Sequence, residues 1–227
     1  MTEWPELLRL HTRHALMPMA DATRAAGAKA YMKDVAPFLG ISAPDRRRAL
    51  RRAWLGLRAP SSDELGDAAL LLMQERDREF HYAAYDAIAH WFSTVDGTFL
   101  PKYGEALILS TPWWDTVDGL VTAMVSPCMQ QFHHDALIDR WSESGNRWLI
   151  RAALGHQRGW KSATETHRVL QLCERHWNDT EFFVAKAIGW ALRDLARLHP
   201  DVVEGFLNDQ QYMNRIAIRE ARRGLGS

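Results

Sequence analysis

The chain has few of the residues that define several common protein classes. Its 227 residues include only two cysteines, Cys128 and Cys173, which are too few for a disulfide framework and too far apart for a thiolate zinc site. No apolar run approaches the ~20 residues that cross a bilayer. The N-terminal segment MTEWPELLRL lacks the apolar core of a secretory signal. We therefore expect a cytoplasmic protein with no membrane partner.

Net charge is also absent, because 28 Lys and Arg residues balance 28 Asp and Glu residues. This balance excludes a histone-like polycation, and a hydrophobic content of 47% predicts a folded chain. Lysine is scarce: five of the 28 basic residues are Lys, and the rest are Arg. Tryptophan is abundant, with ten residues. Arg binds phosphate as a planar fork and Trp offers a flat π face, so a neutral chain can still carry a local recognition surface.

Alternating, strand-like apolar patterns are missing, and the apolar spacing is helical almost throughout. Short Pro- and Gly-containing turns separate the helical segments, which recur in pairs at the roughly 35–45-residue spacing of HEAT-type repeats. We predict an all-α fold, a right-handed superhelical solenoid of degenerate HEAT-like helix pairs with a concave basic face. At this length we expect a single domain over residues 1–227. An irregular helical bundle is the alternative.

Three predicted helices place cations, a carboxylate and Trp side chains on shared faces. In the segment TPWWDTVD, Trp114 and Asp118 are four residues apart and share one face. Basic side chains recur at helical spacing in two later segments, where Trp190 lies among cations. These two stripes are Arg147, Arg151 and Arg158, and then Lys186, Trp190, Arg193 and Arg197. We expect Thr180 to cap the second of these helices, which then runs to about Leu198.

Each stripe has an ordinary explanation, because a helical Trp is usually a core residue and an Arg stripe is usually solvated. Three such stripes within 85 residues favour a site in which Asp and Trp surround a cationic ligand and Arg binds phosphate. The basic run at residues 46–52 is either a solvated face or a phosphate contact. The ten His residues form no ligand-spaced cluster, and the adjacent His133 and His134 cannot face one site on a helix. The sequence also has no Gly-rich phosphate loop and no dinucleotide fingerprint, so we expect no metal ion and no cofactor.

Several longer motifs, in order along nearly the whole chain, resemble the HEAT-like-repeat alkylpurine DNA glycosylases of the AlkD type. The most specific are WWDTVD at residues 113–118, WLIRAA at 148–153 and EFF at 181–183, which continues to KAIGWALR at 186–193. Weaker ones are AYMK at 30–33, FLGI at 38–41, PDRR at 44–47, REF at 78–80 and REA at 219–221. By this resemblance the chain is expected to adopt the same fold and to act on DNA.

The resemblance also implies residue roles. The family's active-site cluster matches Trp114, Asp118, Arg151 and Trp190. Positions on or near the family's DNA-facing surface match Tyr31, Lys33, Arg47, Lys186, Arg193 and Arg219. The implied partner is double-stranded DNA that contains alkylated bases, bound by a monomer that is associated with the nucleoid. The low Lys content and the neutral charge depart from the family's pattern, and we expect them to affect affinity for undamaged DNA more than the chemistry.

The expected activity is hydrolysis of the N-glycosidic bond of 3-methyladenine and 7-methylguanine, without a deep base-flipping pocket, to leave an abasic site. Glycoside hydrolysis normally uses two carboxylates, and the predicted cluster offers only Asp118. One carboxylate is sufficient when the leaving purine is already cationic. Such a base departs as a neutral molecule, so no general acid has to protonate it. A non-catalytic helical-repeat scaffold that binds DNA or protein is the rival hypothesis. A small-molecule binder is a third.

Overall fold

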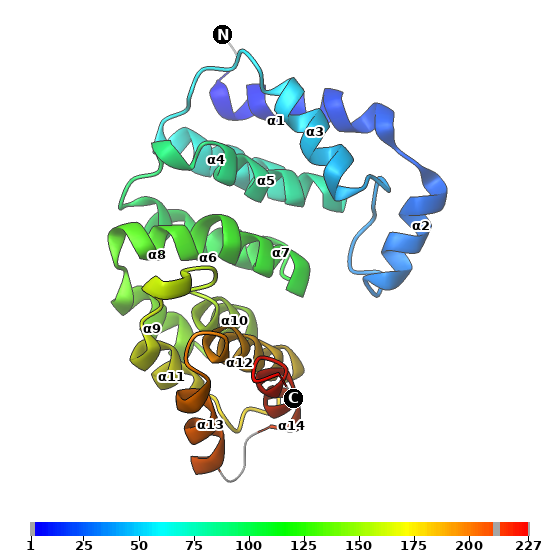
Figure 1. Cartoon of the computed structure of the whole chain (residues 1–227). Helices are drawn as coiled ribbons and strands as arrows, with labels where there is room; N and C mark the ends of the chain where they lie inside the picture. Colours follow the sequence, from blue (N-terminus) through cyan, green and yellow to red (C-terminus); the bar gives the residue numbers. More distant parts are fainter. Residues whose placement is uncertain (1–2, 211–213, 227) are drawn as a thin grey trace. The chain divides into compact units, whose positions relative to one another are not determined.

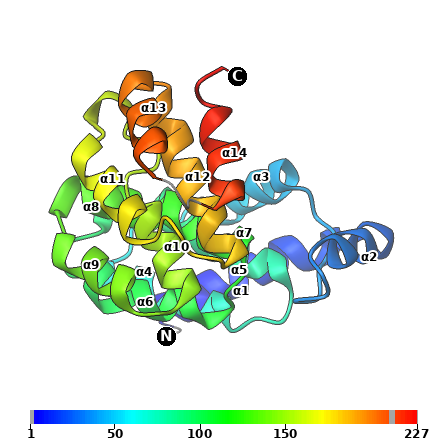
Figure 2. The same ribbon diagram turned by 90° about the horizontal axis from the view of Figure 1, so that it is seen from below.

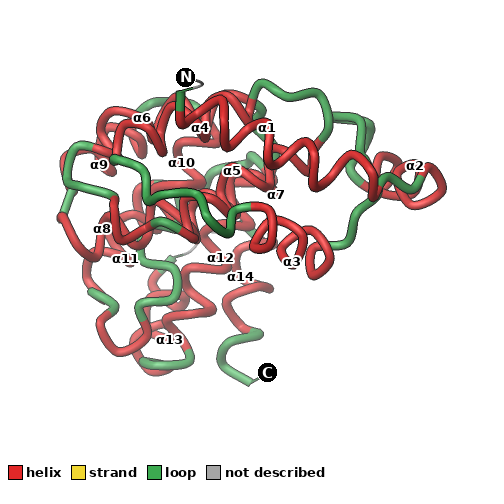
Figure 3. Tube along the Cα trace, turned by 90° about the horizontal axis from the view of Figure 1, so that it is seen from above, coloured by secondary structure: helices red, strands yellow, loops and turns green. Residues whose placement is uncertain are grey.

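The computed structural model describes residues 3–210 and 214–226, and over these ranges it contains helices and loops but no strand (Figure 3). The chain forms two compact units, Met1–Met124 and Val125–Ser227. The prediction of an all-α fold is confirmed. The prediction of a single domain over residues 1–227 stays a prediction, and each unit is described below by itself.

The helices of the first unit pack against one another, with α4 against both α1 and α5, and α7 against α5 and α6 (Figure 1). Short 3-10 turns at Met17–Met19 and Phe92–Thr94 follow α1 and α5. Its helices are α1 (Trp4–Leu16), α2 (Ala22–Tyr31), α3 (Ala43–Ala53), α4 (Ser62–Met73), α5 (Arg78–His90), α6 (Phe99–Ser110) and α7 (Trp114–Leu120). Apolar side chains from these helices form its core, and Leu8, Leu65, Leu72, Phe80 and Phe99 are fully buried.

The second unit follows a π-helical turn, Val121–Val125, that continues α7 into α8. Its helices are α8 (Ser126–Phe132), α9 (Asp135–Glu143), α10 (Arg147–Leu154), α11 (Thr166–Arg175), α12 (Phe182–Ala196), α13 (Pro200–Asp209) and α14 (Arg215–Arg222), with a 3-10 turn at Lys161–Ala163. Helix α12 is central in this unit, because it packs against α10, α11, α13 and α14. Its core includes Met129, Trp141, Leu172, Ile188 and Val203.

Local sequence signals explain where several helices begin. The Ser61 hydroxyl and the Glu64 carboxylate form a reciprocal capping box at α4, and the Asn146 side chain caps α10. The prediction that Thr180 caps the long C-terminal helix is wrong. Glu181 is the N-cap of α12, because its side chain accepts a hydrogen bond from the Phe183 amide. The backbone amide of Glu181 in turn donates to the Asp179 carboxylate. Helix α12 ends at Ala196, two residues before the predicted end.

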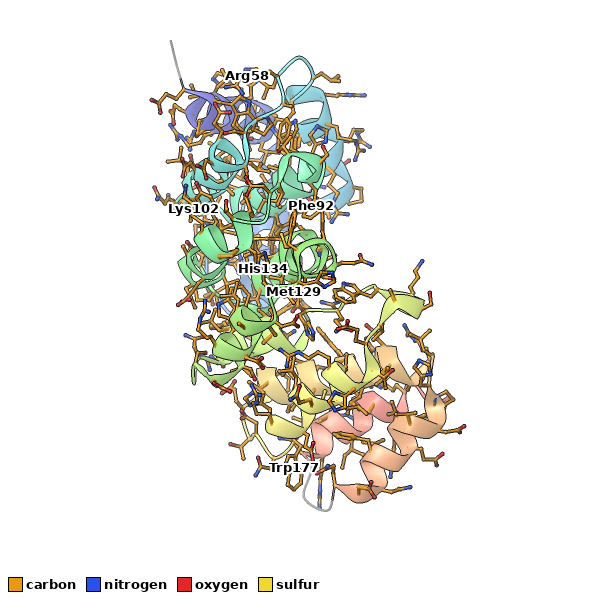
Figure 4. All side chains as sticks on the ribbon, turned by 90° about the vertical axis from the view of Figure 1, so that its left-hand side faces the viewer. Arg58, Phe92, Lys102, Met129, His134 and Trp177 are labelled. Atoms are coloured by element: carbon orange, nitrogen blue, oxygen red, sulfur yellow. The ribbon has the colours of Figure 1, made fainter. Side chains whose placement is uncertain are left out.

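Charged side chains on the outside of the first unit pair with α4. Arg58, in the loop before this helix, pairs with Glu64, and Lys102 on α6 pairs with Asp63. Figure 4 labels both basic side chains. The Arg58 guanidinium and the Ser61 amide hold the pKa of Glu64 at about 2. Exposed ion pairs of this kind contribute little to stability. The abundant charge of the chain is therefore partly neutralised locally, on the surface.

Helix α2 lies at the edge of the first unit (Figures 1 and 2) and buries none of its own side chains. It is held instead by the loop at residues 39–41. The buried Glu79 carboxylate accepts hydrogen bonds from the amides of Leu39, Gly40 and Ile41 at 2.8–3.1 Å. The Asp21 amide donates to the Leu39 carbonyl at 2.8 Å. The loop thus anchors the start of α2, and α2 carries Tyr31 at its other end.

Gly40 makes this attachment possible. Its φ is +84°, and a Cβ there would lie 2.4 Å from the Asp21 carbonyl oxygen and 2.6 Å from the Ala25 nitrogen. Gly56 is a matched control, since its φ is +88° and a Cβ there would meet nothing within 4 Å.

We expect Gly56→Ala to lower the free energy of unfolding by about 1–2 kcal/mol, the cost of a left-handed alanine. Gly40→Ala is expected to lower it by about 1–3 kcal/mol more, because backbone atoms of α2 must move. Urea unfolding measures both changes, and limited proteolysis within residues 22–31 should accelerate only for Gly40→Ala. Equal effects of the two substitutions would show that α2 does not depend on this close approach.

Candidate functional site

Helix α7 and the end of α2 carry the first group of predicted site residues, which we call the Trp114 cluster: Trp114 and Asp118 on α7, and Tyr31 on α2. Trp114 is the first residue of α7 and Asp118 lies one turn later, as the spacing predicts. Both side chains are half-buried. The ring of Tyr31, at the end of α2, meets the Trp114 ring edge to face, with centroids 6.5 Å apart. Tyr31 is nevertheless 73% exposed, so this aromatic pair is open to a ligand.

A buried ion pair holds α7 in place. Arg78, at the start of α5, donates to both carboxylate oxygens of Asp115 at 3.0 and 2.5 Å, and also to the Thr116 hydroxyl and the Thr111 carbonyl. The Tyr82 hydroxyl donates to the same carboxylate at 2.5 Å. Burial and the neighbouring Asp115 charge raise the pKa of Tyr82, so the phenol stays protonated as a donor. The network fixes the helix that presents Trp114 and Asp118.

Gly119 lets α7 approach α5 closely. A Cβ on Gly119 would lie 2.4 Å from the Tyr85 ring, which is closer than side chains pack. Burial raises the pKa of Tyr85 to about 12. The residue directly after Asp118 therefore has to be small, and the motif WDTVDG contains both the candidate carboxylate and the glycine that lets its helix pack.

The other predicted DNA contacts of the first unit lie on its surface. Lys33 is exposed in a left-handed turn that ends α2, with φ +61°. Arg47 is exposed and donates to Asp86 at 3.2 Å. Its neighbour Arg46 points inward, where it pairs with the same carboxylate at 2.9 Å and lies over the Tyr82 ring. The basic run at residues 46–52 is therefore partly structural rather than a uniform surface.

Trp190 on α12 is the centre of the second group, the Trp190 cluster. Four cationic groups lie within 6 Å of the centre of its ring, a range in which cation–π attraction operates. The distances are 4.8 Å for Arg151, 5.3 Å for Arg158, 5.4 Å for Lys186 and 5.9 Å for Arg193. Arg151 is only 3% exposed and donates to the Phe183 carbonyl at 2.7 Å. Lys186 and Arg193 are more accessible.

The predicted stripes account for part of this cluster. Lys186 and Arg193 flank Trp190 on α12, but Arg197 is exposed and pairs with Asp194 instead. Arg147 and Arg151 lie one turn apart on α10 as predicted, but Arg147 lies over Trp148 and Phe183 and pairs with Glu181 instead of joining the Trp190 cluster. Helix α10 ends at Leu154 and Arg158 follows in a turn, which breaks the helical register.

Sequence reasoning assigned no role to Glu220, although it lies in the motif REA. This buried carboxylate on α14 pairs with Lys186 at 2.9 Å, Arg193 at 3.4 Å and Arg223 at 2.8 Å. Burial alone would raise the pKa of Glu220, but hydrogen bonds and the charges of Lys186 and Arg223 outweigh it and lower the pKa. The adjacent Arg219, a predicted DNA contact, is exposed.

The structure thus places the predicted site residues in two clusters, one in each unit. Tyr31, Trp114 and Asp118 lie together in the first unit, and Arg151, Lys186, Trp190 and Arg193 lie together in the second. Lys33, Arg47 and Arg219 are exposed. Over the described ranges, no group of three or more His, Cys, Asp or Glu side chains is arranged to hold a metal ion. No described helix has the length and apolar character of a membrane span.

Comparisons with known proteins agree with the motifs. A family model described as DNA alkylation repair enzyme matches residues 12–225. A solved structure from Enterococcus faecalis, a predicted DNA alkylation repair enzyme, matches with a TM-score of 0.79 at 23% identity, over 92% of this chain and 97% of that chain. No curated protein gives a significant match. The structural likeness confirms the predicted helical-repeat fold, and the family match confirms the resemblance. This chain belongs to the DNA alkylation repair enzyme family.

Proposed function

We propose that this chain is a monofunctional alkylpurine DNA N-glycosylase that acts on cationic purines in duplex DNA. The observation that carries the proposal is the Trp190 ring with four cations around it, a combination suited to a sugar–phosphate backbone. Asp118 and Trp114 supply a carboxylate and a second aromatic face on one helix. Each cluster by itself offers groups that suit DNA, and family membership supports a role in alkylation repair.

The chemistry needs only one carboxylate. In 7-methylguanine or 3-methyladenine the purine carries a formal positive charge, so the C1′–N9 bond breaks with its electron pair moving to the base, which leaves neutral. The sugar becomes oxocarbenium-like, and Asp118 stabilises its positive charge. A water molecule then attacks C1′ and gives its proton to Asp118 as general base. No lysine nucleophile is assigned, so the product is an abasic site.

The remaining residues hold the DNA. Trp114 would offer an aromatic face to the deoxyribose beside Asp118, and Trp190 would offer one to the DNA backbone. Arg151 would orient a backbone phosphate, with Lys186 and Arg193 as the more accessible phosphate ligands of the same cluster. Tyr31, Lys33, Arg47 and Arg219 would add contacts along the duplex. The protein would approach the lesion from the backbone without a deep base-flipping pocket, and it would act as a monomer in the cytoplasm, on the nucleoid.

Release of base from alkylated duplex tests the proposal. Incubation of the full chain with duplexes that contain 7-methylguanine or 3-methyladenine should yield free base by chromatography and alkali-labile abasic sites. A duplex with the neutral lesion ethenoadenine should be a poor substrate, because no acid is assigned to activate it. A non-catalytic scaffold would bind the same duplexes without releasing base, and a small-molecule binder would show no salt-dependent DNA affinity. Efficient removal of ethenoadenine would contradict the mechanism.

A further inference from the structure

Glu220 uses both oxygens of a buried carboxylate to hold cations. Oε1 accepts hydrogen bonds from Lys186 Nζ at 2.9 Å and from Arg223 at 2.8 Å, and Oε2 accepts one from Arg193 at 3.4 Å. Burying a carboxylate costs several kcal/mol before its partners compensate, so packing alone would favour an apolar residue here. The ionised form is stabilised by these cations, which lower the pKa of Glu220.

Two of the three partners of Glu220 are the cations that flank the Trp190 ring. Lys186 precedes Trp190 by four residues and Arg193 follows it by three, so both lie on the same side of α12. Their charged groups are 5.4 and 5.9 Å from the ring centre. Glu220 therefore holds, from a neighbouring helix, the two cations next to the candidate active-site Trp.

The position of Glu220 is enforced by the packing of α14 on α12, which lie side by side (Figure 2). A Cβ on Gly189, the residue before Trp190, would lie 2.5 Å from the Glu220 Cβ and 2.9 Å from the Ala217 carbonyl oxygen. Only glycine permits this approach. The close packing brings the Glu220 carboxylate within reach of Lys186 and Arg193.

We propose that Glu220 is a positioning residue, which aligns Lys186 and Arg193 against Trp190 and limits the positive charge that this cluster offers to a DNA backbone. The inference rests on the proposed function, because that function assigns the Trp190 cluster to DNA. A cluster without Glu220 would attract phosphate more strongly but would orient it less well. Binding and excision should therefore change in opposite directions, which a purely structural carboxylate would not cause.

The test uses Glu220→Gln in the full chain, with two probes: an undamaged duplex and the same duplex with one 7-methylguanine. We expect affinity for the undamaged duplex at low salt to increase about threefold. The plot of log K against log salt should steepen by roughly 0.9, the value of one additional phosphate contact. The single-turnover excision rate should fall about tenfold. An unchanged salt slope together with an unchanged excision rate would overturn the proposal.

Two further variants keep the outcome interpretable. Arg223→Ala removes the one Glu220 partner that does not lie over Trp190, so its excision rate should stay within about twofold of the wild type. Glu220→Asp keeps the charge but shortens the side chain, so it should lower the excision rate and leave the salt slope near the wild-type value.

A lower thermal midpoint in all three variants, with no change in salt slope, would show a purely structural role. If the wild-type chain binds DNA but releases no base, the proposed function fails while the salt slope still tests Glu220.

Discussion

Asp118→Asn is expected to lower the single-turnover release of 7-methylguanine from duplex DNA by at least about 100-fold, the cost of losing one transition-state electrostatic contact. Asparagine keeps the size and shape of the side chain but carries no charge and accepts no proton. It therefore removes both the stabilisation of the oxocarbenium-like sugar and the general base. Binding of the same duplex, measured by fluorescence anisotropy, should stay within about threefold of the wild type.

The matched control for this substitution is Asp63→Asn. Asp63 lies in the same unit, is exposed and pairs with Lys102, and it is not part of the Trp114 cluster. Its variant should release base at the wild-type rate. If Asp118→Asn excises 7-methylguanine as fast as Asp63→Asn does, then the carboxylate of Asp118 is not the catalytic group. Loss of binding together with loss of excision would place Asp118 in substrate recognition instead.

Asp115→Ala is expected to destabilise the protein by about 3–5 kcal/mol, because it leaves the guanidinium of Arg78 buried without its carboxylate. The side chains of Arg78 and Asp115 are only 2% and 7% exposed. For a chain of this size the loss corresponds to a decrease of roughly 6–20 °C in the thermal midpoint, followed by circular dichroism. Tyr82 also loses its acceptor, which adds to the cost.

The same substitution should reduce excision, since Asp115 fixes the helix that carries Trp114 and Asp118. Asp194→Ala is the control, because the Asp194–Arg197 pair is exposed and its loss should change the midpoint by no more than 1–2 °C. The double substitution Arg78→Met with Asp115→Leu removes both charges and should recover much of the stability. A thermal midpoint for Asp115→Ala near that of Asp194→Ala would mean that the buried Arg78–Asp115 pair does not contribute to stability.

The sequence predicted the elements of the fold well because their signals are local. Helical periodicity needs only neighbouring residues, so Trp114 and Asp118 could be placed one turn apart on one helix, and Trp190 among Lys186 and Arg193, before any packing was known. The errors arose where short-range contacts compete. Glu181 rather than Thr180 caps α12, although Thr is the more usual cap, because the Glu181 amide donates to Asp179 and its carboxylate accepts from the Phe183 amide.

The predicted stripe of Arg147, Arg151 and Arg158 needs α10 to continue to Arg158, but this helix ends at Leu154. Arg158 reaches Trp190 from a turn beyond α10 rather than from a helical face, and Arg147 lies over Trp148 instead. Spacing along a helix cannot show where that helix ends to within a turn. The same four-residue periodicity therefore indicated the right neighbourhood for Arg151 and the wrong one for Arg147.

By itself the sequence determined the all-α architecture, the family through its long motifs, and which side chains share a helix face. Only the tertiary structure decided which helices support those faces. Arg78 meets Asp115 across 37 residues, and Lys186 meets Glu220 across 34. Such pairs depend on how helices pack, through close approaches such as Gly119 on Tyr85 and Gly189 on Glu220. Neither periodicity nor composition encodes these contacts, because they join residues that no local spacing relates.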